Sequence, residues 1–405
     1  MKNVFRKTDV LLPRFASDSE EWESWSVIAC DQHTSELSYW EETAAKTKGA
    51  PSTLDLILPE AYLGTDKEDA KKEALKNGKG LPEGFLHEYK DALVYVERTL
   101  SSGMIRRGIV GAIDLDSYSY EPDVSCEIRP TEGTVKERIP PRVAVRRISE
   151  YEASHVMLFC ECSEVFDLLT SKKDQMRRLY DFDLMQGGGH ITGRLVSGEL
   201  LSRVEDMVYK YEEERRASGQ MIYGVGDGNH SLASAKAYLE ELKASGSTIG
   251  GAAEALVELV PITEPSIVFE PIYKTVCGVD PVDLLTFIKN RTDSEETNLA
   301  AVEAHFGDNK DVFRIPLAEG QIVCGVLQTA IDDYISIKGG SCDYIHGKEN
   351  LLALAQRGAV GFIFDGIEKS ELFPYVSKYG VLPRKAFSMG EACEKRYYTE
   401  LRRLK

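Results

Sequence analysis

The sequence has no run of about 18 consecutive apolar residues, the length that a transmembrane helix needs. Its first residues, MKNVFRKTDVLLPRF, include five charged side chains and lack the apolar core of a signal peptide. These absences exclude a membrane partner and predict a cytoplasmic protein.

Basic residues are in deficit. The 49 lysines and arginines stand against 66 acids, for a net charge of −17 over 405 residues. Such a surface repels the phosphate backbone, so we expect no nucleic-acid partner. No repeat at solenoid spacing and no low-complexity tract is present. The 42% hydrophobic content is sufficient for a packed core, and we expect a small-molecule ligand.

No C-x-x-C pair occurs among the 8 cysteines, and they are scattered along the chain. This spacing indicates neither a thiolate zinc site nor a disulfide framework. We therefore expect reduced, structural thiols.

Helix-like and strand-like segments alternate irregularly, which predicts an α+β (mixed α/β) fold with mixed sheets. We expect a main domain over residues 1–275 and a smaller C-terminal α/β lobe over 276–405, with one integrated domain as the alternative. The QGGGHITGR segment lacks the Lys-Ser/Thr pair of a P-loop and predicts a hairpin turn. The residue pattern also predicts helices at 87–101, 201–217, 232–242, 299–306 and 390–405. It predicts strands at 105–115, 221–225, 321–327 and 334–337.

The most informative segment is MIYGVGDGNHSLASAKAYLEEL, residues 221–242. A short apolar strand leads into a turn containing Gly226 and Gly228, and Asn229 or Ser231 can cap the helix that follows. Such a turn presents backbone N–H groups at the positive end of a helix, which suits a phosphate or carboxylate. A tight strand–helix connection with no ligand is the competing interpretation.

Within this segment, GDGNHSLASAKAY resembles the D-G-H-H-R motif of a bacterial family known as domain of unknown function 1015. Asp227, Gly228 and His230 match the motif. Asn229 and Ser231 replace its first His and its Arg.

Four other segments resemble motifs of the same family, in the same order. SVIACDQHTSELSYW is similar to its P-P-Y-D opening, with Asp31 at the Asp. IRPTEGTVKERIPPR resembles R-P-H-E-x-T and keeps Arg129 and Glu132. FEPIYKTV resembles P-x-H-R with Lys274 at the Arg, and GVLPRKAFSM resembles M-P-x-K-S-T and keeps Lys385. The chain is identified as a divergent member.

The glycine turn is also similar to the phosphate-binding box of the ParB/sulfiredoxin superfamily, which includes sulfiredoxin, CTP-binding ParB proteins and a free-serine kinase. This resemblance implies a strand–glycine turn–helix core that holds nucleotide phosphates. The residues implied in binding are Gly226, Gly228, Asn229, Ser231, Arg129, Glu132 and Lys274. Ser231 stands where an arginine would clamp the phosphate, and Arg129 either clamps an anion or fixes its own loop.

Three functions remain open. The first is a nucleotide-dependent phosphotransferase that acts on a small-molecule hydroxyl, with a nucleotide di- or triphosphate and Mg²⁺ as cofactors. Its catalytic candidates are Asp31, Asp227 and His230, with Glu36 as an alternative for orienting the acceptor. The second is a metal-dependent hydrolase, in which His33 joins these three as a ligand. The third is a nucleotide-binding regulator without catalysis.

Overall fold

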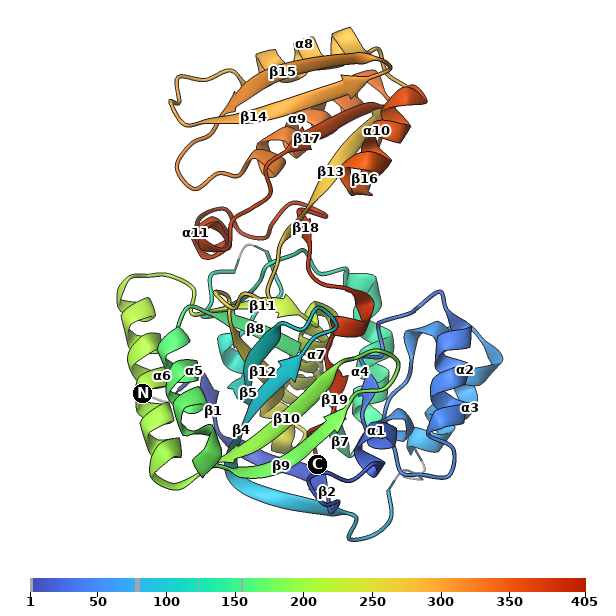
Figure 1. The fold of residues 1–405 in the computed structure, drawn as a ribbon, viewed down its shortest axis with the longest axis vertical. Helices are drawn as coiled ribbons and strands as arrows, with labels where there is room; N and C mark the ends of the chain where they lie inside the picture. Colours follow the sequence, from blue (N-terminus) through green and yellow to red (C-terminus); the bar gives the residue numbers. More distant parts are fainter. Residues whose placement is uncertain (1–2, 77–80, 123, 154–155) are drawn as a thin grey trace. The chain divides into compact units, whose positions relative to one another are not determined.

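The computed structural model describes residues 3–76, 81–122, 124–153 and 156–405, and the chain forms two compact units. The first unit comprises residues 1–130, 134–267 and 391–405. The second comprises residues 131–133 and 268–390. Figure 1 shows the elements of both, and the mixed α/β fold class is confirmed.

A 12-stranded mixed sheet forms the centre of the first unit, in the order β6-β11-β8-β12-β5-β4-β2-β20-β7. Strand β1 also pairs with β5, and the β9–β10 hairpin joins through β4. The sheet strands are β1 (Phe5–Arg6), β2 (Thr8–Pro13), β4 (Leu86–Thr99), β5 (Ile105–Asp114), β6 (Ile128–Pro130), β7 (Tyr151–Ala153), β8 (Val156–Cys160), β9 (Arg177–Asp183), β10 (His190–Val196), β11 (Tyr223–Asp227), β12 (Glu254–Pro261) and β20 (Leu401–Arg403). A separate pair is made by β3 (Val27–Ile28) and β19 (Tyr397–Tyr398).

Strand β4 divides two hydrophobic cores. Leu93 and Tyr95 belong to one core, and Ala92, Val94 and Val96 belong to the other. Successive side chains of a strand point to opposite faces, so a continuous apolar run fits a strand that is covered on both sides.

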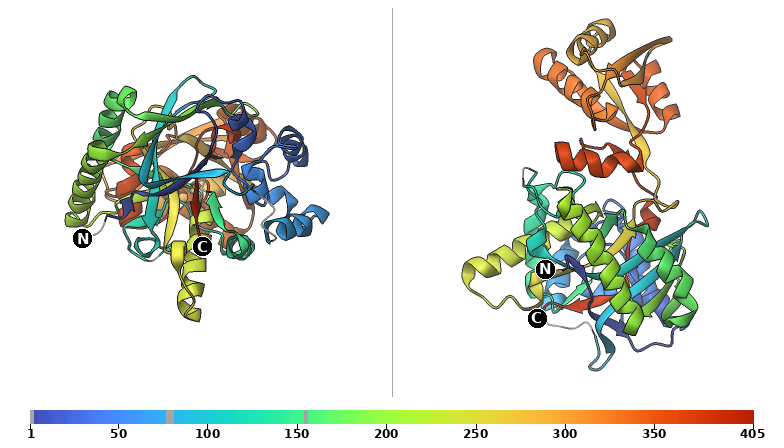
Figure 2. Two further views of the ribbon diagram at one scale, coloured as in Figure 1. Left: turned by 90° about the horizontal axis from the view of Figure 1, so that it is seen from below. Right: turned by 90° about the vertical axis from the view of Figure 1, so that its left-hand side faces the viewer.

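The helices of this unit lie around the sheet. They are α1 (Glu21–Trp25), α2 (Leu37–Lys46), α3 (Asp66–Lys76), α4 (Ile139–Ile148), α5 (Ser163–Lys172), α6 (Gly198–Ala217) and α7 (Asn229–Ser245). Helices α5 and α6 lie side by side (Figure 1). Helix α4 packs on α7, and the C-terminal end of α7 projects from the unit (Figure 2).

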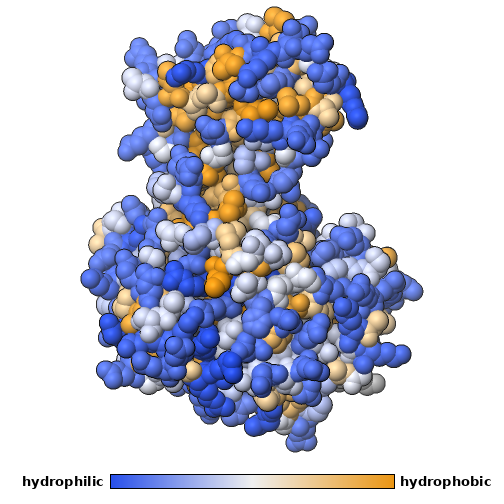
Figure 3. Space-filling model, viewed as in Figure 1, coloured by the Kyte–Doolittle hydropathy of each residue, from blue (hydrophilic) through white to orange (hydrophobic). Residues whose placement is uncertain are grey.

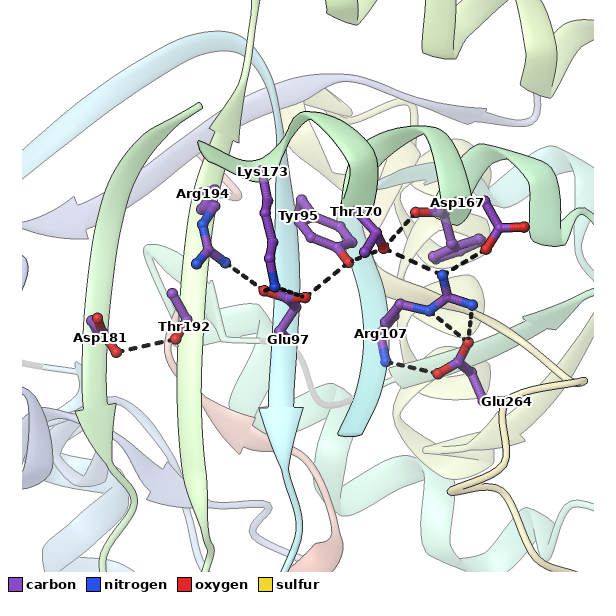
Figure 4. Close-up of polar contacts among 11 residues, drawn as sticks. Tyr95, Glu97, Arg107, Asp167, Thr170, Lys173, Asp181, Thr192, Arg194 and Glu264 are labelled. Carbon is purple, nitrogen blue, oxygen red and sulfur yellow. Dashed lines mark hydrogen bonds and ion pairs between the residues drawn. The ribbon is translucent and has the colours of Figure 1, made fainter. Parts of the chain in front are cut away.

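A polar network attaches α5 to the sheet (Figure 4). Glu97 accepts from Arg194 at 2.7 Å and from Lys173 at 3.2 Å. Arg107 donates to Glu264 and to Asp167, both at 2.8 Å. Each charged side chain in this part of the sheet thus has a group of opposite charge within hydrogen-bond distance, which offsets the cost of removing it from water.

The second unit is built on a six-stranded sheet in the order β15-β14-β17-β13-β16, and β18 pairs with β13. Its strands are β13 (Glu270–Cys277), β14 (Leu299–Phe306), β15 (Asn309–Pro316), β16 (Ser341–His346), β17 (Val360–Phe364) and β18 (Phe387–Ser388). Its helices are α8 (Pro281–Thr292), α9 (Val323–Lys338), α10 (Lys348–Gln356) and α11 (Lys369–Tyr379).

Several predicted elements are confirmed: the strands at 105–115 and 221–225, the helices at 201–217 and 232–242, and the hairpin after β9. The helices predicted at 87–101 and 299–306 are wrong, because these segments form β4 and β14. The helix predicted at 390–405 is also wrong. Residues 396–402 are all buried, as fits the short strands β19 and β20 better than a one-sided helix.

The two strands predicted at 321–327 and 334–337 are wrong too, since both lie in α9. Cys324, Leu327, Ile331 and Tyr334 are buried at helical spacing on this segment. The β-branched residues of the segment favour strands, but the burial of this apolar stripe favours the helix that the segment forms.

No helix in the described ranges combines the length and apolarity that crossing a membrane requires. The face drawn in Figure 3 is mostly hydrophilic, and its apolar side chains lie in small groups.

Candidate functional site

The turn between β11 and α7 has the geometry that its glycines indicate. Gly228 is the N-cap of α7 and has a φ of 80°, in the left-handed region. A Cβ added there would lie 2.9 Å from the Cα of Val156. A Cβ at Gly226 would lie 2.5 Å from the ring of Phe159. Both positions therefore require glycine, one for its backbone angle and both for space.

His230, in the first turn of α7, is held by the loop that follows β6. Its Nε2 accepts the backbone N–H of Val135 at 3.2 Å, so this nitrogen carries no proton. Burial, with Arg142 and Arg138 nearby, lowers the pKa of His230 to about 4, and Asp31 opposes the shift. The imidazole is neutral at neutral pH, and it polarises or donates as an uncharged group.

Two arginines supply positive charge beside this helix start. Arg138 ends a 3-10 turn (Lys136–Arg138), and Arg142 lies in the first turn of α4. Arg142 pairs with Glu60 and lies 3.9 Å from Asp31, and its Nη1 donates to the carbonyl of Arg138 at 3.2 Å. The Nε of Arg142 is buried and has no hydrogen-bond partner among the described residues. A buried donor without a partner is costly, and an anion bound here would relieve that cost.

A cavity of about 380 Å³ adjoins this cluster within the first unit. Its polar lining includes Arg138, Arg142, Glu60 and, from the start of α7, Ser231 and Ser234. Its apolar lining includes Leu56, Leu58, Val145, Leu232 and Ala235. A cavity of this size with one charged end suits a ligand that carries an anion at one end and a flat apolar group at the other.

Cys30 lines the same cavity but is no candidate nucleophile. Burial, together with the nearby charge of Asp31, raises the pKa of its thiol to about 12. The thiol therefore stays protonated at neutral pH, and a protonated thiol is a poor nucleophile.

The structure does not bring the four metal candidates together. His33 stacks on Tyr39 with ring centroids 3.8 Å apart, and its Nδ1 lies 3.1 Å from Glu36. Asp227 accepts the backbone N–H of Gly228 and lies 3.9 Å from the Nζ of Lys395. Within the described ranges, no three His, Cys, Asp or Glu side chains are grouped to hold a metal ion. The metal-dependent hydrolase gains no support from this geometry.

The other predicted anion ligands lie outside the cavity lining. Arg129 donates to the carbonyl of Cys126 at 3.1 Å and to Ser125 at 2.5 Å, so it braces its own loop. Glu132 belongs to the second unit, where it forms a β-bridge with Leu382. Lys274 is fully buried in the second unit.

Sequence reasoning missed Arg138 and Arg142. They occur in KERIPPR, where a proline pair marks the start of a helix. Residues four apart at the start of a helix lie on the same face, so the spacing of Arg138 and Arg142 could have indicated that they act on one ligand.

Comparison with known proteins identifies the family. Residues 11–330 match the family described as "Protein of unknown function (DUF1015)". The chain belongs to this family. No curated protein matches this DUF1015 sequence.

Similar solved structures include a conserved hypothetical protein from Pyrococcus furiosus, with 14% identity and a TM-score of 0.33 over 69% of this chain and 90% of that chain. A free serine kinase in complex with AMP has 15% identity and a TM-score of 0.37, over 71% of this chain and 90% of that chain. SbnI with a C-terminal truncation, from Staphylococcus aureus, has 11% identity and a TM-score of 0.34, over 72% and 81%. Similarity at this level does not transfer a ligand.

Proposed function

We propose that this DUF1015 protein binds a nucleotide in the cavity beside α7 and transfers a phosphoryl group from it to the hydroxyl of a small molecule. The observation that carries the proposal is that Arg138 and Arg142 line one cavity together with Ser231 and Leu232 of the first turn of α7. Phosphoryl transfer depends mainly on positioning and charge stabilisation, and these groups supply both.

In this proposal the phosphates lie against Ser231 and the two arginines. The Nε of Arg142, which has no hydrogen-bond partner among the described residues, donates to a phosphate oxygen. The base lies between apolar side chains such as Leu56 and Val145. Arg142 thus takes over the charge that the family's arginine would supply at position 231.

His230 and Asp31 have separate roles. His230 is neutral, and its occupied Nε2 leaves Nδ1 as the donor that orients a phosphate oxygen. Asp31, beside Arg142, accepts the proton of the attacking hydroxyl. The phosphoryl group leaves the nucleotide's bridging oxygen and bonds to the acceptor oxygen. Gly226, Gly228 and Asn229 shape the turn, while Asp227 stabilises it through the N–H of Gly228.

Mg²⁺ needs only one or two carboxylates when phosphates supply other ligands. Glu60, the acid that pairs with Arg142, would hold it through its carboxylate. The ion would neutralise charge on the phosphates.

Calorimetric titration of ADP and ATP, each with and without Mg²⁺, tests the proposal. We expect binding to the wild type and a loss of at least about tenfold in Arg142→Ala. Arg147→Ala is the matched control, because Arg147 lies on the same helix and pairs with Glu241 outside the cavity. Equal affinity in the Arg142 variant and the control would refute the proposed site.

Turnover separates the enzyme from the regulator that binds without catalysis. Incubation with the nucleotide that binds and a panel of small hydroxyl compounds should give a phosphorylated product, and Asp31→Asn should reduce its rate without a comparable loss of nucleotide affinity. Binding with no product from any acceptor would favour the regulator.

A further inference from the structure

A second polar cavity lies wholly within the second unit, around α9. It has a volume of about 690 Å³, and its lining includes Gln328 and Asp332 of α9, Tyr344 of β16, and Arg384. Asp332 and Arg384 are exposed, while Gln328 is buried. The cavity therefore carries both charges at its opening and an uncharged amide deeper inside.

Behind this lining lies Lys274, in the middle of β13. It is the cross-strand partner of Tyr344 and of Phe362, and its exposed fraction is 0%. Its Nζ lies 5.1 Å from the ring centroid of Tyr344, on the face of the sheet that carries the cavity wall. Burial lowers the pKa of Lys274, and Cys324, Cys342 and Asp332 partly offset this effect.

Two buried polar atoms in this region lack hydrogen bonds within the described ranges: the Nζ of Lys274 and the Oε1 of Gln328. Gln328 is 6% exposed, and its Nε2 donates to Asp332 at 2.8 Å, so only its acceptor is unsatisfied. One atom is a donor and the other an acceptor. Buried polar groups without partners are rare in folded proteins, and a bound ligand is one reason for them.

We propose that this cavity binds a small free amino acid. The α-carboxylate would interact with Arg384 and with the positive charge of Lys274. The α-ammonium would donate to the Oε1 of Gln328 and the carboxylate of Asp332. A molecule with both charges on adjacent carbons matches the two charges at the opening and satisfies the acceptor deeper inside.

The test is a thermal-shift and calorimetry screen of the full chain with the free amino acids as probes. Each amino acid that binds is compared with its amide, which lacks the carboxylate, and with its deaminated acid, which lacks the ammonium. We expect at least one amino acid to raise the melting temperature by mass action and both analogues to bind at least about tenfold more weakly. A screen in which no amino acid binds at millimolar concentration would overturn the proposal.

Two variants locate the site. Lys274→Met and Gln328→Leu each remove one unsatisfied polar atom while keeping an apolar side chain of similar length, so both should fold. We expect each to weaken amino-acid binding at least about tenfold. Arg142→Ala should leave it unchanged, which separates this site from an acceptor bound in the first unit. Binding that survives both of the first two changes, or that is lost only with Arg142, would overturn the assignment to this cavity.

Discussion

Arg107 and Lys274 are both cationic side chains set into a β-sheet, and their surroundings differ sharply. Burial lowers the pKa of Arg107, but the hydrogen bonds that its guanidinium donates to Glu264 and Asp167 outweigh burial, and the net shift of the pKa is upward (Figure 4). Burial also lowers the pKa of Lys274, and the net shift stays downward because the amine has no hydrogen-bond partner among the residues that the structure describes. The first charge is satisfied by the fold itself, whereas the second is not. This difference separates a structural ion pair from a binding site.

The largest effect should come from breaking the satisfied network. Glu264→Gln removes the charge of the partner that is 3% exposed, and we expect it to destabilise the protein by about 2–3 kcal/mol in urea unfolding. Asp167→Asn is the matched control on the same arginine. Asp167 is 66% exposed, so its loss should cost less than about 1 kcal/mol. Equal costs would show that burial does not decide the strength of these pairs.

The turn before α7 tests a requirement that the fold imposes on the backbone. Gly228→Ala places a Cβ 2.9 Å from a backbone atom at a residue with positive φ, and we expect the free energy of unfolding to fall by about 2 kcal/mol. Gly246, at the other end of the same helix, also has a positive φ, but a Cβ there would meet no atom of the described residues within 4 Å, so we expect Gly246→Ala to cost about 1 kcal/mol of stability. Denaturant unfolding of both variants measures the difference. A Gly246 variant as unstable as the Gly228 variant would remove the close approach as the cause.

His230 resembles Lys274 in having a lowered pKa. Its folded pKa of about 4 lies below its ordinary value of 6.5, so the unfolded chain binds more protons between these values. Stability should therefore fall as the pH decreases from 6.5 to 4. His230→Asn should show a shallower fall when melting temperatures are compared at pH 7 and pH 5. Identical slopes in the two proteins would mean that this histidine is not the titrating group.

The smallest effect on stability should come from Lys274→Met. Because the amine forms no hydrogen bond within the described part of the chain, replacing it with an apolar side chain should leave stability unchanged or raise it by up to about 1 kcal/mol. The folded pKa lies below the ordinary 10.5, so wild-type stability should rise with pH as the pH approaches 10.5, and the variant should lack this rise. Urea unfolding at pH 8 and pH 10 measures both. Strong destabilisation of the variant would contradict the contrast with Arg107.

The turn before α7 could be predicted from the sequence, because the need for glycine at positions 226 and 228 has a local cause. A positive φ and a close backbone approach leave few residue types possible, and the pattern is visible within a few residues. It failed at β4, where an apolar run fits both a helix and a doubly buried strand. Only the second core, supplied by distant segments, decides between them.

The candidate site shows the same limit. The start of α7 was predictable, but the ion pair of Arg142 with Glu60 joins an α-helix to a 3-10 helix 82 positions earlier in the chain. Lys274 is likewise influenced by Cys324 and Asp332 of α9, a segment that the sequence pattern did not identify as a helix. Contacts between distant segments leave little signal in the local sequence. The charged residues that lie together in each cavity can therefore be identified only once the fold is known.

The most direct test of the account is a crystal structure of the protein with a non-hydrolysable ATP analogue and Mg²⁺. We predict phosphate oxygens at about 3 Å from the Nε of Arg142 and from the backbone N–H groups at the start of α7, with the base among the apolar side chains around Leu56. A nucleotide whose phosphates contact neither Arg142 nor this helix start would contradict the central claim.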